Sequence, residues 1–149
     1  MAKALVTNES GVRVRTDLIR RAVDAALPEE GSVGILLADD EALRRLNRTH
    51  RNQDEATDVL TFPSPDWARE SLLGEIAISI DFARRGAQRR GVSLSQETAY
   101  LALHGALHLA GLDDQTDEDR AEMVRRMNQA AERAGLKPDL DWHSMPHGE

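Results

Sequence analysis

The chain has 149 residues, a formal net charge of −7 and no cysteine. This length suits one domain with its own hydrophobic core, and the lack of cysteine excludes disulfides and thiolate metal ligands and fits a reducing cytosol. The acidic charge argues against binding nucleic acid through bulk positive charge, and no apolar run approaches the ~20 residues of a membrane span, so we expect a soluble cytoplasmic protein that does not bind membranes.

Short apolar stretches between turn residues predict four or five β-strands. They cover residues 3–6, 12–14, 33–38, 59–62 and 73–80. The run 33–38 is apolar throughout, which predicts a strand buried on both faces. In 73–80 the alternation of residues places Ile76, Ile78 and Ile80 on one face.

Helical periodicity and capping residues predict the helices. They begin at Thr16, at Asp39 or Asp40, at Asp81, at Ser93 and at Thr116. Gln96, three residues after Ser93, completes a capping box for the helix that runs to Ala110. We therefore predict a single α+β domain over residues 1–149, with a mixed sheet of about four to five strands and a helical C-terminal half. Its core covers about residues 3–136, and residues 137–149 form a flexible tail.

Two histidines lie four residues apart in the leucine-rich helix that ends near Ala110. His104 and His108 are separated by one helical turn, so both imidazoles project from the same face. Gly111 follows where a helix commonly ends in a left-handed residue, and the chain can then bring Asp113 or Asp114 back to the histidines. Two helical ligands and one from the returning loop form the layout of an open catalytic zinc site. The alternative is a pair of core histidines satisfied by hydrogen bonds.

Residue 105 bears on the type of chemistry. Helix-borne zinc peptidases carry a glutamate base directly after the first histidine, and this chain has Gly105 there. The glycine disfavours a metallopeptidase and instead allows close approach of another backbone or of a bulky substrate. The remaining histidines could supply a ligand only if they fold toward this helix; they are His50, His143 and His147.

Three blocks of sequence, in order, carry a resemblance to a known family. The first holds Leu46-Asn47, Arg51, Asp54 and Thr57-Asp58-Val59-Leu60-Thr61-Phe62-Pro63, the second is Leu73-Gly74-Glu75-Ile76-Ala77-Ile78-Ser79, and the third is His104-Gly105-x-Leu107-His108-Leu109-x-Gly111-x-Asp113. Over roughly residues 30 to 135 they resemble the YbeY family, bacterial endoribonucleases of ribosomal RNA maturation.

The resemblance implies a metal-dependent hydrolase with zinc on the histidine face, and an arginine, here Arg51, that is needed for activity and contacts RNA. The catalytic candidates are therefore Arg51, His104 and His108. The family motif usually closes with a third histidine directly after the aspartate, where this chain has Asp114. A carboxylate is an acceptable zinc ligand, so we expect His104, His108 and Asp114 to hold one zinc ion, or a harder divalent cation such as manganese. In the alternative, Asp113 is the ligand and Asp114 orients a histidine.

The implied work is maturation of the 3′ end of small-subunit ribosomal RNA, together with quality control of ribosomes. We expect the Arg44 to Arg51 face to guide single-stranded RNA. The expected partners are ribosomal RNA, the small ribosomal subunit and ribosomal proteins or assembly GTPases, because placement by a partner compensates for the weak RNA affinity of an acidic protein. A non-catalytic ribosome-assembly factor with an altered metal site is the alternative function, ahead of a metallopeptidase.

Overall fold

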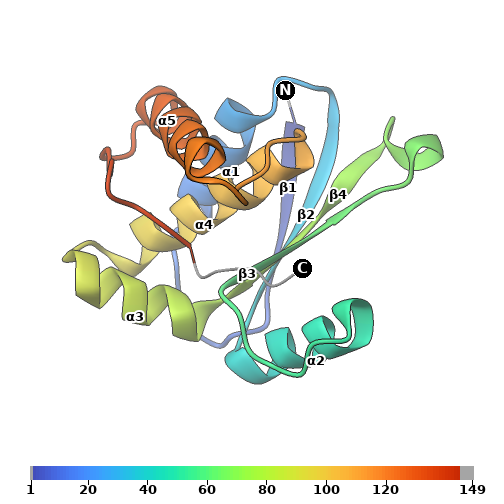
Figure 1. Cartoon of the computed structure of the whole chain (residues 1–149), viewed down its shortest axis with the longest axis horizontal. Helices are drawn as coiled ribbons and strands as arrows, with labels where there is room; N and C mark the ends of the chain where they lie inside the picture. Colours follow the sequence, from blue (N-terminus) through green and yellow to red (C-terminus); the bar gives the residue numbers. More distant parts are fainter. Residues whose placement is uncertain (1, 145–149) are drawn as a thin grey trace.

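A mixed four-stranded sheet lies at the centre of the protein. The computed structural model describes residues 2–144 (Figure 1). The strands are β1 (Ala2–Asn8), β2 (Gly31–Ala38), β3 (Val59–Pro63) and β4 (Leu72–Ser79), in the order β1-β2-β4-β3. β1, β2 and β4 are parallel, and β3 pairs antiparallel with β4. The α+β class, the mixed sheet and the helical C-terminal half are confirmed.

Five α-helices within the described residues flank this sheet. They are α1 (Thr16–Ala26), α2 (Asp40–Arg51), α3 (Ile80–Arg90), α4 (Leu94–Leu109) and α5 (Asp117–Ala134), and a short 3₁₀ helix, η1, covers Asp66–Ala68. α4 packs on β3 and β4 and against α1, α3 and α5, whereas α2 covers part of the other face (Figure 1). No helix in residues 2–144 is long and apolar enough to cross a membrane.

Two strand expectations are wrong. Residues 12–14 pair with no strand of the described sheet, because Asn8 folds the chain into a turn by donating to the Val12 carbonyl, and Val12 and Val14 pack against the core instead. β2 is not buried on both faces: Val33, Ile35 and Leu37 are buried but Leu36 is only half-buried, since α2 covers that face incompletely.

The predicted starts of the helices are mostly confirmed. Asp39, Ser93 and Thr116 each cap a helix by accepting from a backbone N–H, and the helix predicted from Asp81 begins at Ile80, with Ser79 as its cap. Thr16 is not a cap: Arg15 holds that position and makes no side-chain capping bond. The capping box at Ser93 is only half formed, because the Gln96 side chain reaches the Lys137 carbonyl.

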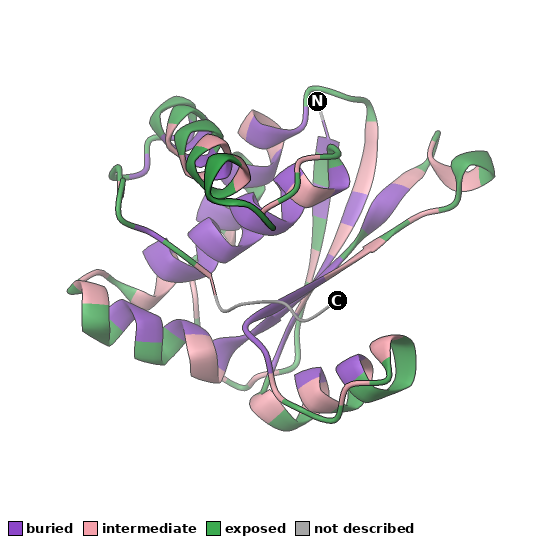
Figure 2. Cartoon of the chain, in the orientation of Figure 1, coloured by how far each residue is buried: buried purple, intermediate pink, exposed green. Residues whose placement is uncertain are grey.

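α4 is buried along nearly its whole length (Figure 2). Gly105 makes this possible where the helix crosses the sheet: a Cβ there would lie 2.8 Å from Cγ2 of Ile76 and 3.1 Å from Cγ2 of Thr61. Glycine was expected to allow close approach of another backbone or of a bulky substrate; the atoms that come close are instead side-chain carbons of Ile76 and Thr61. The helix that carries both histidines is thereby held directly against β3 and β4.

The expectation that residues 137–149 form a flexible tail is wrong for residues 137–144. Trp142 is only 3% exposed and belongs to the main hydrophobic core, packed beside Tyr100 with a ring-centroid separation of 6.2 Å. Its indole N–H donates to Glu97, so both the apolar ring and the polar group of this side chain find partners inside the protein. The last part of the predicted tail, residues 145–149 with His147, lies outside the described residues.

Candidate metal centre

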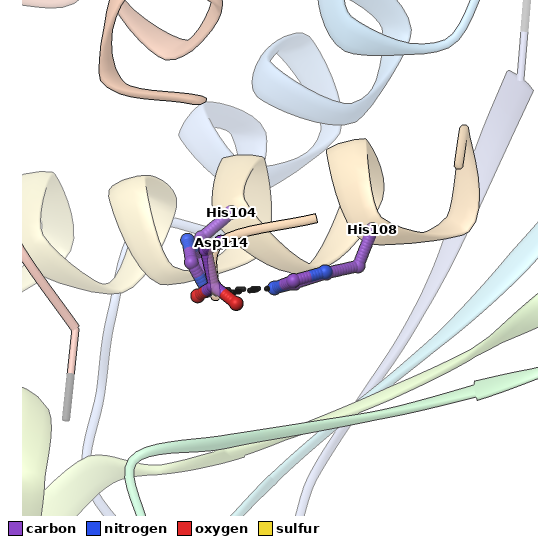
Figure 3. Close-up of side chains that lie close together, drawn as sticks. All are labelled: His104, His108 and Asp114. Carbon is purple, nitrogen blue, oxygen red and sulfur yellow. Dashed lines mark hydrogen bonds and ion pairs between the residues drawn. The ribbon is translucent and has the colours of Figure 1, made fainter. Parts of the chain in front are cut away.

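Three side chains converge beneath α4. His104 is 2% exposed and His108 follows it one turn later on the same helix, while Asp114 comes from the loop beyond Gly111 (Figure 3). Oδ2 of Asp114 lies 3.3 Å from Nε2 of His104 and 3.5 Å from Nε2 of His108, and the two Nε2 atoms are 3.0 Å apart. These residues form a group that could hold a metal ion.

The loop after α4 decides which aspartate reaches the histidines. Gly111 has a φ of +101°, and the Leu112 N–H donates to the Leu107 carbonyl, which turns the chain back along the helix. Oδ1 of Asp113 then accepts from the Asp114 N–H at 2.8 Å, so the Asp113 carboxylate stabilises the loop. Of the two alternatives, the structure places Asp114 at the histidines. That Asp114 binds a metal stays a prediction.

The separations of the three atoms fit a zinc ion. Zinc bonds of ~2.0–2.1 Å in a tetrahedron put the ligand atoms roughly 3.3–3.4 Å apart, close to the three distances here. His108 also donates from Nδ1 to the Leu112 carbonyl, at 3.0 Å. In the neutral imidazole that a metal ligand must be, that bond keeps the proton on Nδ1 and leaves the lone pair of Nε2 for the ion. The donor set and its geometry therefore suit an ion with three protein ligands and an open position.

The charges of the group also suit a cation. Burial lowers the pKa of His104 below its ordinary value, so its imidazole is neutral at pH 7. Hydrogen bonds from His104 and His108 hold the pKa of Asp114 well below its usual range. Burial by itself would lower the pKa of His108, but its hydrogen bond with Asp114 raises it overall. The ionised Asp114 and the neutral His104 are in the protonation states that a metal ion requires, and binding of an ion would displace a proton from His108.

Arg51 lies at the rim of the same site. A pocket of about 220 Å³ is lined by Arg51, Thr61, Pro63, His108 and Asp114 among others. The Arg51 guanidinium donates to the Thr61 carbonyl at 2.9 Å, and its Nε–H has no hydrogen-bond partner among residues 2–144. The pocket thus joins an incompletely paired cation to two members of the histidine–aspartate group.

The other predicted surface residues are placed differently. Arg44 is half-buried and Arg48 is exposed, and both pair with Asp54, so part of the charge on the Arg44 to Arg51 face is neutralised. His50 packs on the ring of Phe62 at 5.1 Å and is not part of the group. His143 is exposed, and its carbonyl accepts from Arg90.

Sequence reasoning missed two residues beside His104. The Trp142 ring lies 5.3 Å from the His104 ring, and Oγ of Ser144 lies 3.4 Å from His104 Nε2. The one available signal was a tryptophan within a mostly polar segment, which predicts burial rather than a loose tail.

Comparison with known proteins points to one family. The sequence model of a family described as Endoribonuclease YbeY matches residues 6–135. Proteins named endoribonuclease YbeY from Desulforamulus reducens and Pelotomaculum thermopropionicum are 40% and 39% identical, over 80% and 81% of this chain and 86% and 87% of those proteins. The solution structure of TM1509 from Thermotoga maritima is similar in fold, with a TM-score of 0.62 and 25% identity over 90% of this chain and 89% of that one.

Proposed function

The chain belongs to the family of the endoribonuclease YbeY, and from that premise we propose that it is a zinc-dependent enzyme that cuts single-stranded RNA during 3′-end maturation of small-subunit ribosomal RNA. The resemblance seen in the sequence is confirmed, and the chain is a metal-dependent endoribonuclease. The observation that supports the zinc site is the convergence of His104, His108 and Asp114 within 3.5 Å of one another.

In this proposal, His104, His108 and Asp114 hold the ion. When bound, zinc supplies a Lewis acid for the phosphoryl oxygen and lowers the pKa of a coordinated water. Asp114 adds one negative charge relative to a site with a third imidazole, and this favours harder cations such as manganese more than three histidines would. The Leu112 carbonyl orients His108, and burial holds the His104 side chain of α4 in place, so both ligand atoms are already positioned.

Arg51 has a separate task. Arg51 lines the same pocket as His108 and Asp114, and its Nε–H has no partner within residues 2–144. An arginine in that position contacts a phosphate of the substrate and neutralises its charge. A pocket of about 220 Å³ suits one backbone linkage of a flexible strand, whereas the backbone of a duplex would not easily reach into it.

The charge of the whole protein supports a role at the ribosome. A net charge of −7 gives little general attraction to RNA, so binding to the small subunit or to ribosomal proteins or assembly GTPases would supply the local concentration of substrate. A function in ribosome quality control and a cytoplasmic location belong to the same proposal. The peptidase alternative has no support at the site, because Gly105 supplies no base and is packed against Ile76.

The test compares cleavage of one fluorescent RNA as a single strand and as a duplex. We expect the zinc-loaded protein to cut the single strand faster, the chelator-treated protein to cut neither, and His108→Ala to be inactive. Precursor small-subunit RNA should be cut near its mature 3′ end, and faster within the subunit than free. An intact single strand after incubation with zinc-loaded protein, or full activity in His108→Ala, would overturn the proposal.

A further inference from the structure

Residues 137–144, here named the C-terminal segment, are fastened along α4. The Lys137 carbonyl accepts from the Gln96 side chain at 2.8 Å and from the Tyr100 hydroxyl at 2.6 Å. Asp139 exchanges two hydrogen bonds with the Asn128 side chain on α5, at 2.7 and 3.1 Å. Figure 1 shows the segment returning from the end of α5 past α4. These contacts fix its path over the helix that carries the histidines.

A buried ion pair holds the far end of the segment. Glu97 of α4 is 4% exposed and pairs with Arg90 at the end of α3. Oε1 of Glu97 also accepts from the indole N–H of Trp142 at 3.0 Å, and Arg90 lies over the Trp142 ring and donates to the His143 carbonyl. Burial raises the pKa of Glu97 to about 7. Such a pair contributes little net stability but fixes one arrangement of the groups around it.

The end of the segment reaches the metal group. The His104 imidazole lies between two rings, with His108 at 4.5 Å and Trp142 at 5.3 Å between centroids. Two residues further on, the Ser144 hydroxyl is 3.4 Å from the His104 atom that faces Asp114. Trp142 therefore limits the positions that the His104 ring can take.

We infer that the C-terminal segment is part of the metal centre, and that Trp142, anchored by Glu97 and Arg90, is a positioning residue that fixes the His104 imidazole for zinc. The inference rests on the proposed zinc site. It goes beyond family membership, because Trp142 and Ser144 lie outside the residues 6–135 that the family sequence matches. Removing a group that orients a metal ligand typically lowers the affinity for the metal by a factor of about ten to a hundred.

The experiment measures zinc dissociation constants by competition with a chromophoric chelator, together with the visible spectrum of the cobalt-substituted protein. Trp142→Leu keeps an apolar side chain but removes the ring beside His104. We expect its zinc dissociation constant to rise at least tenfold and its cobalt bands to shift. Trp142→Phe, which keeps a ring at that place, should bind within about threefold of the wild type.

The matched control is Met127→Ala, which removes a fully buried side chain from the same core at a position outside the metal group. It should lower Tm at least as much as Trp142→Leu does, yet leave the zinc dissociation constant and the cobalt spectrum unchanged. If Trp142→Leu does not fold, Glu97→Gln carries the test, because it removes the ion-pair anchor and keeps the side-chain shape. We then expect at least a threefold rise in the zinc constant.

The outcomes separate the two proposals. A wild-type protein that binds no zinc refutes the proposed zinc site itself. A wild-type protein that binds zinc, with a Trp142→Leu variant of equal affinity and unchanged cobalt spectrum, refutes only the role of the segment. Equal weakening of zinc binding by Trp142→Leu and Met127→Ala also refutes the role of the segment, because the effect would then follow from lost core packing alone.

Discussion

Gly105→Ala tests how closely α4 must lie on the sheet to form the site. The added methyl would lie 2.8 and 3.1 Å from two carbons of Ile76 and 3.1 Å from Cγ2 of Thr61. Carbon atoms attract best at ~3.5–4.0 Å, so helix and sheet must separate by a substantial fraction of an ångström. Overpacking of this kind costs ~1–3 kcal/mol, against which alanine in place of glycine stabilises a helix by ~1 kcal/mol.

We therefore expect Gly105→Ala to lower the free energy of unfolding by about 1 kcal/mol and Tm by about 2–4 °C. Because residue 105 follows His104 on the same helix, the shift also disturbs the metal group, and zinc affinity should fall. Tm is measured on the chelator-treated protein, so that folding is separated from metal binding. Gly34→Ala is the control, since its new methyl would meet mainly the flexible Glu75 side chain.

A double-mutant cycle identifies the cause. Ile76→Ala alone costs ~2–5 kcal/mol because it leaves a cavity. In the double variant the methyl added at position 105 fills part of that space, so the variant should be more stable than the sum of the single effects by about 1 kcal/mol. A fully stable Gly105→Ala, or strictly additive effects in the cycle, would refute the idea that contact with Ile76 requires glycine here.

Three further predictions concern the site and its support. Asp114→Ala should reduce bound zinc from about one per chain to nearly none, whereas Asp113→Ala should keep it; equal loss in both would contradict the assignment of Asp114. Arg51→Ala should lose RNA cleavage at unchanged zinc content, and wild-type rates would exclude the phosphate contact. Because burial raises the pKa of Glu97 from its ordinary 4.5 to about 7, the folded state holds the extra proton, and wild-type stability should fall relative to Glu97→Gln as the pH rises from 4.5 to 7. Thermal unfolding of both proteins at pH 5 and pH 8 measures this, and a constant difference in Tm would contradict it.

Local rules predicted most of the fold and the helical half of the site. His104 and His108 share a face because of helical periodicity, and Gly111 ends the helix because glycine adopts a positive φ at low cost. Asp39, Ser93 and Thr116 cap helices because their short side chains satisfy free N–H groups. In each case the cause lies within a few residues of the effect.

The remaining features depend on contacts between residues far apart in the chain. The choice of Asp114 over Asp113 is an exception, because it follows from a bond between neighbours: the Asp113 carboxylate accepts from the Asp114 N–H, which spacing alone does not reveal. The Gln96 side chain donates to the Lys137 carbonyl, 41 residues away, instead of completing the capping box. Trp142 is held in the core by its hydrogen bond to Glu97, 45 residues away. A mostly polar segment with one tryptophan therefore predicts a tail, because the distant residues that pack around the indole ring are not visible in the local sequence.

Anomalous X-ray diffraction at the zinc edge, from a crystal of protein purified without chelator, tests the central claim most directly. We expect one peak about 2.0–2.2 Å from Nε2 of His104, Nε2 of His108 and a carboxylate oxygen of Asp114. A protein that cuts single-stranded RNA but shows no peak at this group, or a peak held by other residues, would contradict the account.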